Sequence, residues 1–274
     1  MTTTLHAIWS AVAPAWAEHA DYADARGAEV TSRMLSLADP SPGDRVLELA
    51  CGPGGAGLAA AALAGEVVLS DVSAEMAAIA GDRAAERGLT NVTTRVLDLE
   101  QIAEPDAAYD VVLCRDGLMF AFDPAGAADE IKRVLRPGGR LAIAVWGPRE
   151  RNPWLGIMFD AVTAQLGHPV PPPGMPGPFA LSDAGRLRSI LAGSGLEDVT
   201  VAEVPVPMRA ASFVAWLERT TALAGPLAGL LAALPEEAAR ELRGRLRDAV
   251  TPYRTGEGLV FPGVALVASG RRAS

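Results

Sequence analysis

The sequence predicts an α/β fold with a doubly wound, mainly parallel sheet, and three observations support that prediction. Short apolar runs alternate with helical stretches between residues 45 and 147, at the spacing of strand–helix–strand crossover units. The first apolar run ends in a glycine-rich turn, where sheets of this kind bind ligands. Hydrophobic residues make up 50% of the 274 residues, which is ample for a buried core.

A helical segment precedes the first strand. Apolar residues such as Trp9 and Trp16 recur at helical intervals between residues 5 and 38, until the sequence DPSPG at residues 39–43 breaks the pattern. We expect residues 1–44 to form a helical segment that lies over the binding pocket. The two tryptophans fit equally well a role in packing this segment on the core and a role in closing over a ligand.

The central part of the chain, residues 45–147, is predicted to hold the cofactor-binding core. Strands are expected at residues 45–49, 67–70, 92–97, 110–114 and 140–145, and helices after Gly57 and at residues 74–87 and 125–135. Strands joined by helices in this way pair in parallel, because each connection has to cross over the sheet.

The last part, residues 148–274, is expected to supply a lid, cap helices and the last two strands of the sheet. A helix at residues 153–166 leads into HPVPPPGMPGP, residues 168–178, whose prolines exclude regular structure. The other elements expected are a helix at residues 183–192 capped by Ser182, a strand at 199–206, three helical stretches within 211–250 and a final strand at 259–268.

Charge and cysteine content indicate the kind of partner and the compartment. The formal net charge of −9 and the pI near 4.9 disfavour nucleic acid and anionic membranes, and favour a small molecule. The two cysteines, Cys51 and Cys114, lie in apolar contexts that are typical of a reducing compartment. With no signal-peptide pattern and no apolar run of about 20 residues, we expect a cytoplasmic protein, either a monomer or a homodimer.

The stretch VLELACGPGG, residues 46–55, is the candidate cofactor site. Gly52 and Gly54 lie at the carboxyl end of the first strand, where backbone without side chains can approach a ligand closely. Asp71, at the end of the next strand, can bind a ribose diol. Because Gly52-x-Gly54-x-x-Gly57 followed by Asp71 also satisfies the dinucleotide fingerprint, this turn alone does not separate two kinds of cofactor.

Three further features favour a sulfonium cofactor with an adenosine. Glu48 can accept bonds from the turn amides or from a cofactor ammonium group, whereas it would repel a pyrophosphate. Asp98-Leu99 ends the third strand, where a carboxylate can accept the adenine amino proton and the next amide can meet a ring nitrogen. Pro137-Gly138-Gly139 is expected to form a sharp turn between the helix and the strand of the fifth unit.

Four motifs then occur in order: ELACGPGG (48–55), SDVSAEM (70–76), LDLE (97–100) and VLRPGGRL (134–141). On these motifs the chain resembles class I S-adenosylmethionine-dependent methyltransferases, near the ubiquinone/menaquinone-biosynthesis type and small-molecule tailoring enzymes of natural-product pathways. The resemblance implies a Rossmann-like, seven-stranded mixed sheet whose last strand runs antiparallel. It also implies S-adenosylmethionine as cofactor, S-adenosylhomocysteine as product and methyl transfer to the oxygen, carbon or nitrogen of a small hydrophobic or aromatic acceptor in secondary metabolism or quinone-like biosynthesis.

The resemblance also implies the cofactor contacts, position by position. They are Glu48, Ala50, Gly52 and Gly54 at the methionine end, Asp71 at the ribose, Val72 and Met76 beside the adenine, Asp98 and Leu99 at its edge, and Cys114 and Arg115 under the sulfonium. Ala50 replaces the glycine of many members, but alanine is common there in the subgroup that this chain resembles.

The acceptor pocket is expected outside these motifs, in an apolar wall that suits a hydrophobic or aromatic molecule. Its candidate residues are Trp9, Trp16, Phe120, Trp154, Phe159, His168, Phe179 and Trp216. Each of them also fits an ordinary helical core. His19 is the candidate general base, which a hydroxyl acceptor would use and an activated carbon would not need. No metal site is predicted.

Two other functions were weighed against methyl transfer. The first is a nicotinamide-dependent reductase, which Glu48 and the lack of a Tyr-x-x-x-Lys pair disfavour, since Lys132 is the only lysine. The second is a protein of the same fold that binds the cofactor and catalyses a rearrangement without methyl transfer. The sequence does not exclude this second function.

Overall fold

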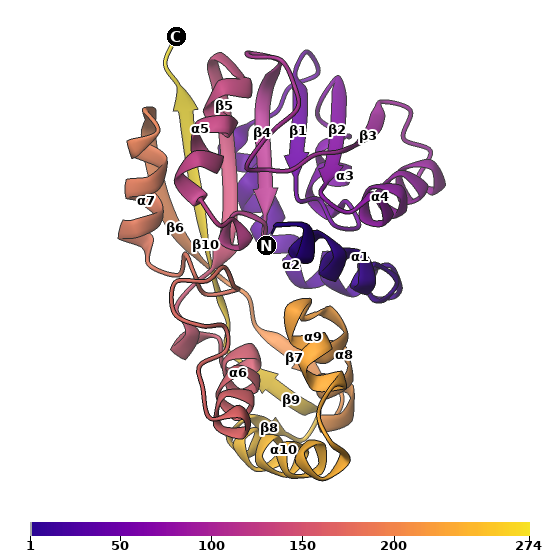
Figure 1. Cartoon of the computed structure of the whole chain (residues 1–274). Coiled ribbons are helices and arrows are strands. Elements are labelled where there is room, and N and C mark those ends of the chain that lie inside the picture. Colours follow the sequence, from indigo (N-terminus) through magenta and orange to yellow (C-terminus); the bar gives the residue numbers. More distant parts are fainter. Residues whose placement is uncertain (1) are drawn as a thin grey trace.

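A computed structural model describes the backbone of residues 2–274 and the side chains of residues 6–225 and 227–274. Its core is a seven-stranded sheet in the order β3-β2-β1-β4-β5-β10-β6 (Figure 1). The strands are β1 (Arg45–Leu49), β2 (Glu66–Asp71), β3 (Val92–Val96), β4 (Tyr109–Arg115), β5 (Leu135–Trp146), β6 (Leu196–Pro205) and β10 (Val264–Arg272).

The pairing of the strands confirms the predicted mixed, doubly wound sheet. β1 pairs in parallel with β2 and β4, and the parallel part extends to β3 on one side and β5 on the other. β10 is antiparallel to both β5 and β6. The strand order reverses between β1 and β4, so their carboxyl ends border the crevice where open α/β sheets bind ligands.

Helices cover both faces of the sheet. They are α2 (Ala20–Ala38), α3 (Gly55–Ala60), α4 (Ala74–Glu86), α5 (Pro124–Val134) and α7 (Ala184–Gly193). Among them, α4, α5 and α7 begin at side-chain caps. The Ser73 hydroxyl accepts a hydrogen bond from the Met76 amide and so caps α4, while Asp123 caps α5 just before Pro124. These caps fix the helix starts that follow the strand ends.

The N-terminal segment consists of α1 (Thr2–Glu18) followed by α2, with His19 between them. α2 packs on β5 and β10, whereas α1 contacts α4 of the sheet layer and two helices of the cap, α8 (Phe213–Leu223) and α9 (Pro226–Ala232). The segment therefore bridges the two parts of the molecule across the carboxyl ends of the strands (Figure 1).

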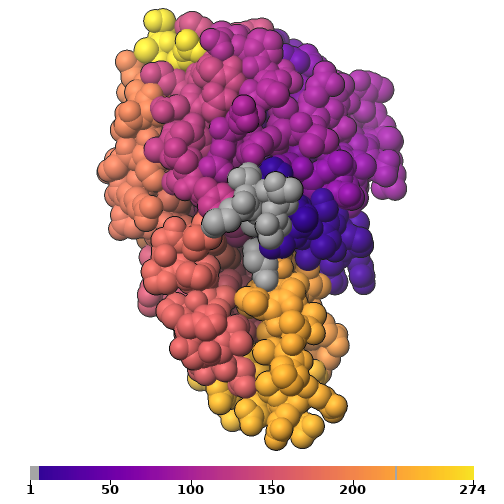
Figure 2. All heavy atoms as spheres, viewed as in Figure 1, coloured from indigo at the N-terminus to yellow at the C-terminus, as the bar shows by residue number. Residues whose placement is uncertain are grey.

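The remaining elements form a smaller cap beyond the sheet, which is the narrower lobe of Figure 2. They are α6 (Pro153–Leu166), α8 (Phe213–Leu223), α9 (Pro226–Ala232), α10 (Glu236–Ala249) and a small sheet of β7 (Met208–Ala210), β9 (Gly258–Phe261) and β8 (Arg254–Thr255). Short 3₁₀ turns lie at η1 (Leu118–Phe120), η2 (Arg149–Arg151) and η3 (Thr251–Tyr253). None of the helices within residues 2–274 is both long and apolar enough to cross a membrane.

Asn152 joins the cap to the sheet. Its side chain is fully buried and donates hydrogen bonds to the carbonyls of Gly147 and Val264, while its oxygen accepts from the Val264 amide and the Trp154 indole. This one amide therefore fixes the end of β5, the start of β10 and the beginning of α6 relative to each other.

Three local predictions were wrong. The expected final strand at 259–268 is two strands in different sheets, because Pro262 lacks the N–H that a continuous ladder needs. α7 is capped by Asp183, which accepts from the Arg186 amide, and not by Ser182. The sequence Pro137-Gly138-Gly139 lies inside β5, where Gly138 has φ +75° and the register with β4 shifts, so it forms an irregularity within a strand.

Candidate functional site

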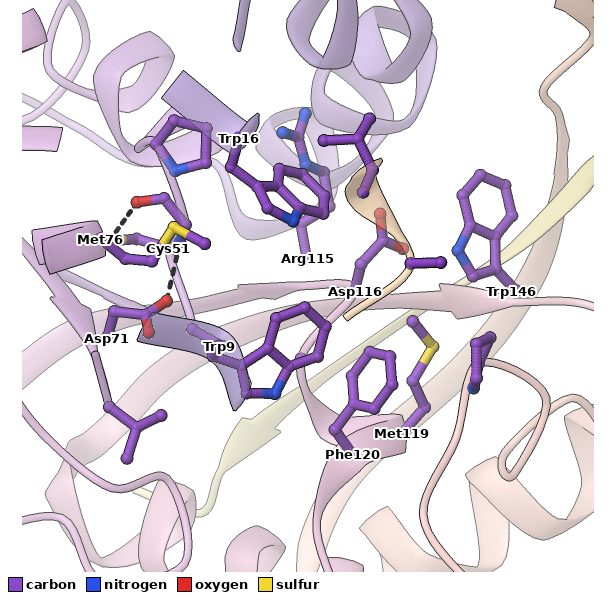
Figure 3. A pocket seen from close by; sticks show the side chains of 18 of the residues that line it. Trp9, Trp16, Cys51, Asp71, Met76, Arg115, Asp116, Met119, Phe120 and Trp146 are labelled. Carbon is purple, nitrogen blue, oxygen red and sulfur yellow. Dashed lines mark hydrogen bonds between the residues drawn. The ribbon is translucent and has the colours of Figure 1, made fainter. Parts of the chain in front are cut away.

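A large cavity lies at the carboxyl ends of β1, β2 and β4, and the N-terminal helices and the cap also contribute side chains to its lining, part of which Figure 3 shows. It holds about 1500 Å³ of free space, its open mouth included. Its lining combines residues of the glycine-rich turn, of α1 and α2 and of the cap, so one continuous space lies between the strand ends and the cap.

The glycine-rich turn forms one wall of the cavity. Ala50 has φ +51° and Gly52 has φ +52°, so the backbone turns sharply directly after β1. A Cβ built on Gly52 would have no other atom within 4 Å, which shows that the backbone there faces open space. The turn therefore offers a ligand the close approach that a glycine allows.

Asp71 ties this turn to the start of α4. One carboxylate oxygen accepts from the Gly52 amide at 2.9 Å and the other accepts from the Ser73 amide at 2.9 Å. The side chain lines the cavity, as Figure 3 shows, although only 6% of the residue is exposed, and burial raises its pKa. A carboxylate held by two amides keeps a fixed direction, and its other lone pairs can accept from a ligand.

Glu48 lies beneath the turn and does not line the cavity. Its carboxylate accepts from the Gly57 amide at 2.8 Å, as expected for a bond to the turn amides, and only 1% of the residue is exposed. Burial raises its pKa to about 7. A Cβ at Gly57 would overlap Leu69 and lie 2.6 Å from Glu48 Oε2, so this position requires a glycine.

The opposite side of the cofactor end is built from β3 and α1. Asp98 lines the cavity, accepts from the Glu100 amide and lies 3.5 Å from Nε2 of His6. Trp9, one helical turn after His6, packs edge to face on Phe120 with ring centroids 4.9 Å apart. The face of α1 that carries His6 and Trp9 therefore closes this part of the cavity.

Most of the predicted cofactor residues are brought together in the cavity lining, and three are not. Those in the lining are Ala50, Gly52, Asp71, Val72, Met76, Asp98, Leu99 and Arg115. The three residues outside the lining are Glu48, Gly54 and Cys114. Gly54 faces Ala80 and Leu58, and Cys114 is fully buried, which raises the pKa of its thiol to about 12.

Arg115 lines the cavity, and its guanidinium is anchored on α2. Its guanidinium donates to the Thr31 hydroxyl at 2.8 Å and lies 3.8 Å from Asp24. Gly27 and Gly55 make room for this group, since a Cβ at either position would collide with it. The guanidinium therefore fixes α2 and α3 on β4.

Some of the residues predicted for the acceptor pocket line the cavity, and others lie outside it. The predicted residues that line the cavity are Trp9, Trp16, Phe120, Trp154 and Phe159. His168 is exposed outside the lining, Phe179 packs on Phe159, and Trp216 is buried with its indole N–H donated to the Trp154 carbonyl. His19 also lies outside the lining, in the break between α1 and α2, so the candidate base is misplaced and the histidine in the cavity is His6.

Sequence reasoning missed a charged pair in the cavity, Arg26 on α2 and Asp116 directly after β4. The Arg26 side chain is only 10% exposed, and its guanidinium lies 5.2 Å from the Trp146 ring and 5.7 Å from the Trp154 ring. Burial lowers the pKa of Arg26 and raises that of Asp116. In the sequence, only its position directly after Arg115, at the end of a strand, indicated that Asp116 could belong to the site.

Within residues 2–274 the structure contains no cluster of three acidic, histidine or cysteine side chains able to hold a metal.

Known proteins show similarity along the chain. A family model described as a methyltransferase domain matches residues 47–143. The ubiquinone/menaquinone biosynthesis C-methyltransferase UbiE of Azotobacter vinelandii is 30% identical over 188 residues, covering 61% of this chain and 71% of the relative. Nocamycin O-methyltransferase of Saccharothrix syringae is 29% identical over 205 residues, covering 69% of this chain and 73% of the relative. An uncharacterized protein of Mycobacterium tuberculosis is 35% identical over 113 residues, and this match spans only 41% of the relative's length.

Solved structures show the same fold at low identity. The YcgJ protein from Bacillus subtilis has a TM-score of 0.62 at 20% identity, covering 89% of this chain and 98% of that one. The [4+2]-cyclase SpnF has a TM-score of 0.56 at 22% identity, covering 89% of this chain and 80% of that one. Phosphoethanolamine N-methyltransferase 2 of Haemonchus contortus, solved with S-adenosylmethionine, has a TM-score of 0.56 at 19% identity, covering 89% and 52%.

The family assignment rests on sequence and fold together. The match to UbiE extends beyond the methyltransferase domain, and the strand order, the glycine-rich turn and the acidic residue at the end of β2 agree with it. The chain belongs to the class I S-adenosylmethionine-dependent methyltransferases of the UbiE-like kind, whose cofactor is S-adenosylmethionine.

Proposed function

We propose that this protein transfers the methyl group of S-adenosylmethionine to a small apolar or aromatic acceptor. The observation that carries this proposal is one continuous cavity with two chemically different ends. Asp71 and Met76 lie at one end, near the glycine-rich turn, and Trp146 lies at the other (Figure 3). A cofactor at the first end would present its reactive group to an acceptor at the second.

The residues of the first end fit the cofactor's polar groups. Asp71 would accept hydrogen bonds from the ribose hydroxyls, because its two amide partners already fix its direction. Asp98 would accept from the adenine amino group, and Val72 with Met76 would pack on the ring. The open space at Gly52 would take the methionine portion.

The second end fits an apolar acceptor. Trp146 and Trp154 pack edge to face, with ring centroids 5.1 Å apart, and Leu155, Phe159 and Met208 extend this wall. Aromatic and aliphatic surface of this kind favours a hydrophobic or aromatic molecule. The similarity to the ubiquinone/menaquinone biosynthesis enzyme UbiE and to nocamycin O-methyltransferase supports an acceptor from quinone-like or secondary metabolism.

The protein's part in the reaction would be to position the acceptor and to exclude water. When bound, S-adenosylmethionine supplies an electrophilic methyl group on a positively charged sulfur. The chain has to hold the acceptor atom in line at about 3 Å from that methyl group. The Trp9–Phe120 contact joins α1 to η1 at the cavity wall, and a bound cofactor and acceptor packed against these rings would keep water from the reacting atoms.

Two titrations and one assay test the proposal. S-adenosylhomocysteine should bind wild-type protein in calorimetry. NADH should not bind, because the Glu48 carboxylate accepts the Gly57 amide of the turn and would repel a pyrophosphate there. In a panel of apolar acceptors analysed by mass spectrometry, at least one should gain a methyl group and release S-adenosylhomocysteine. Tight NADH binding without S-adenosylhomocysteine binding would refute the proposal, and a product formed without cofactor turnover would favour the rearrangement function.

A further inference from the structure

Arg26 and Asp116 lie across from each other in the cavity without closing into a hydrogen bond. The nearest approach between the guanidinium and the Asp116 carboxylate is 4.0 Å, which is longer than a hydrogen bond. Asp116 lies on the Trp146 side of the cavity, away from Asp71 (Figure 3). The Nε of Arg26 is buried and has no hydrogen-bond partner among the described residues.

Other charged groups near Asp116 already have partners. Arg115, the preceding residue on β4, donates to Thr31. Arg219 on α8 donates to the Arg209 carbonyl and stacks on Tyr22 of α2, 3.6 Å from the ring centroid. Arg26 and Asp116 thus differ from them in keeping hydrogen-bonding capacity directed at the cavity.

An open charged pair of this kind is costly unless a ligand completes it. The Arg26 side chain is only 10% exposed, and a charged group with so little access to water needs hydrogen bonds from its surroundings, whereas the Asp116 side chain, 24% exposed, is accessible from the cavity. The backbone at Asp116 adds strain, since its φ of +61° is unfavourable for a residue with a Cβ. Strain and unsatisfied charge at a strand end that borders the cavity are typical of a functional site.

The chemistry of the gap selects one kind of ligand group. A group between the two side chains has to accept a hydrogen bond from Arg26 and donate one to Asp116, and a hydroxyl does both. A protonated amine would be repelled by Arg26, and a carbon nucleophile would satisfy neither side chain. A further buried donor without a partner among the described residues, the Trp16 indole N–H, belongs to a side chain that lines the same cavity and also favours a ligand oxygen.

We propose that the acceptor presents an aromatic hydroxyl to Arg26 and Asp116, and that the oxygen of this hydroxyl receives the methyl group. The inference rests on the proposed function and specifies the substrate class of the same site. The rings of Trp146 and Trp154 beside Arg26 provide the apolar surface on which the aromatic part of such an acceptor packs.

The transfer step then has a defined path for each proton and electron pair. The hydroxyl proton passes to the Asp116 carboxylate, and an oxygen lone pair forms the new O–C bond as the C–S bond breaks. The electron pair of that bond stays on sulfur, which becomes neutral. Arg26 stabilises the negative charge that develops on oxygen, and Asp116 later releases its proton to solvent. Burial raises the pKa of Asp116, and a higher pKa makes a carboxylate a better proton acceptor.

The test uses 4-nitrophenol, whose phenolate and phenol forms have different absorption spectra. The probe is titrated into the protein saturated with S-adenosylhomocysteine, at a pH just below the pKa of the free probe. Asp116→Asn leaves the Arg26 cation without a counter-charge, so its bound probe should shift toward phenolate. Arg26→Gln leaves the Asp116 carboxylate alone, so its bound probe should shift toward phenol. Since an adjacent charge shifts a pKa by about 1–3 units, the phenolate-to-phenol ratio should differ about tenfold or more between the variants.

Matched controls separate this inference from the proposed function. Arg33→Gln, at an exposed position of α2, and Asp129→Asn, at an exposed position of α5, should leave the probe spectrum unchanged. 4-Nitroanisole, which lacks the hydroxyl proton, should bind the Arg26 and Asp116 variants equally well. Wild-type protein that fails to bind S-adenosylhomocysteine would refute the proposed function itself.

Three results would overturn the hydroxyl site while leaving the proposed function intact. The first is that neither 4-nitrophenol nor the larger 4-nitro-1-naphthol binds the S-adenosylhomocysteine complex saturably. The second is that the bound probe has the same spectrum in both variants. The third is that Arg26→Gln weakens the binding of S-adenosylhomocysteine as much as it weakens the binding of the probe, because Arg26 would then serve the cofactor.

Discussion

Two alanine substitutions in the glycine-rich turn should have opposite consequences for stability and for cofactor binding. Gly57→Ala places a methyl group against Leu69 and within 2.6 Å of Glu48 Oε2, inside the packed layer beneath the turn. Gly52→Ala places the same group where no atom lies within 4 Å, on the side that faces the cavity. The first change should therefore destabilise the fold, and the second should obstruct the ligand.

The magnitudes follow from these contacts. Overpacking a core costs about 1–3 kcal/mol, and weakening the hydrogen bond between the Gly57 amide and Glu48 adds about 1.5–3 kcal/mol if Glu48 is ionised. Gly57→Ala should thus lower the free energy of unfolding by about 2.5–6 kcal/mol. At Gly52 the φ of +52° costs an alanine about 1–2 kcal/mol. Ala50 already adopts this conformation, so the fold tolerates it.

Urea denaturation and calorimetric titration with S-adenosylhomocysteine measure the two effects on the same samples. Gly57→Ala should show the larger loss of unfolding free energy, and Gly52→Ala should show the larger loss of affinity among variants that remain folded. Equal stability of Gly57→Ala and wild type would refute the packing argument. Full affinity of Gly52→Ala would place the ligand elsewhere.

Three further predictions concern single side chains. Asp71→Asn should weaken S-adenosylhomocysteine binding by about 1.5–3 kcal/mol in calorimetry, as expected for lost charged hydrogen bonds, while Asp129→Asn at an exposed position should not. Asn152→Ala should lower the free energy of unfolding in urea by about 2–4 kcal/mol, because the buried amide and carbonyl of Val264 lose their partner, and an unchanged value would contradict its role as the joint between sheet and cap. Glu48, whose pKa is raised to about 7 by burial, contributes stability in its protonated form below about pH 4.5 that is lost as the pH rises through 7. Between about pH 5 and pH 8, the free energy of unfolding of the wild-type protein should therefore fall by roughly 1–3 kcal/mol more than that of Glu48→Gln. An equal fall for the two proteins in urea denaturation would refute this assignment.

The sheet and the cofactor turn were predictable because their signals are local. The strand from Arg45 to Leu49, the turn after it and the carboxylate at Asp71 each follow from a short apolar run, its glycines and the strand end that comes next. The final strand was not predictable in this way, because apolar residues continue on both sides of Pro262 and only the pairing partners separate β9 from β10.

The candidate residues of the acceptor end depend on contacts between distant segments. His19 lies three residues after Trp16, so a continuous helix would place both on one face, but α1 ends at Glu18 and the chain changes direction. Arg26 and Asp116 are 90 positions apart in the sequence, and each resembles an ordinary surface charge by itself. Only the packing of α2 against the end of β4 buries them together.

A crystal structure of the protein with S-adenosylhomocysteine tests the central claim most directly. We predict the ribose hydroxyls within hydrogen-bond distance of Asp71, the adenine beside Met76 and Asp98, and the sulfur directed toward Asp116 and the apolar end of the cavity. S-adenosylhomocysteine bound away from the glycine-rich turn, or bound with its sulfur directed away from Asp116, would contradict the account.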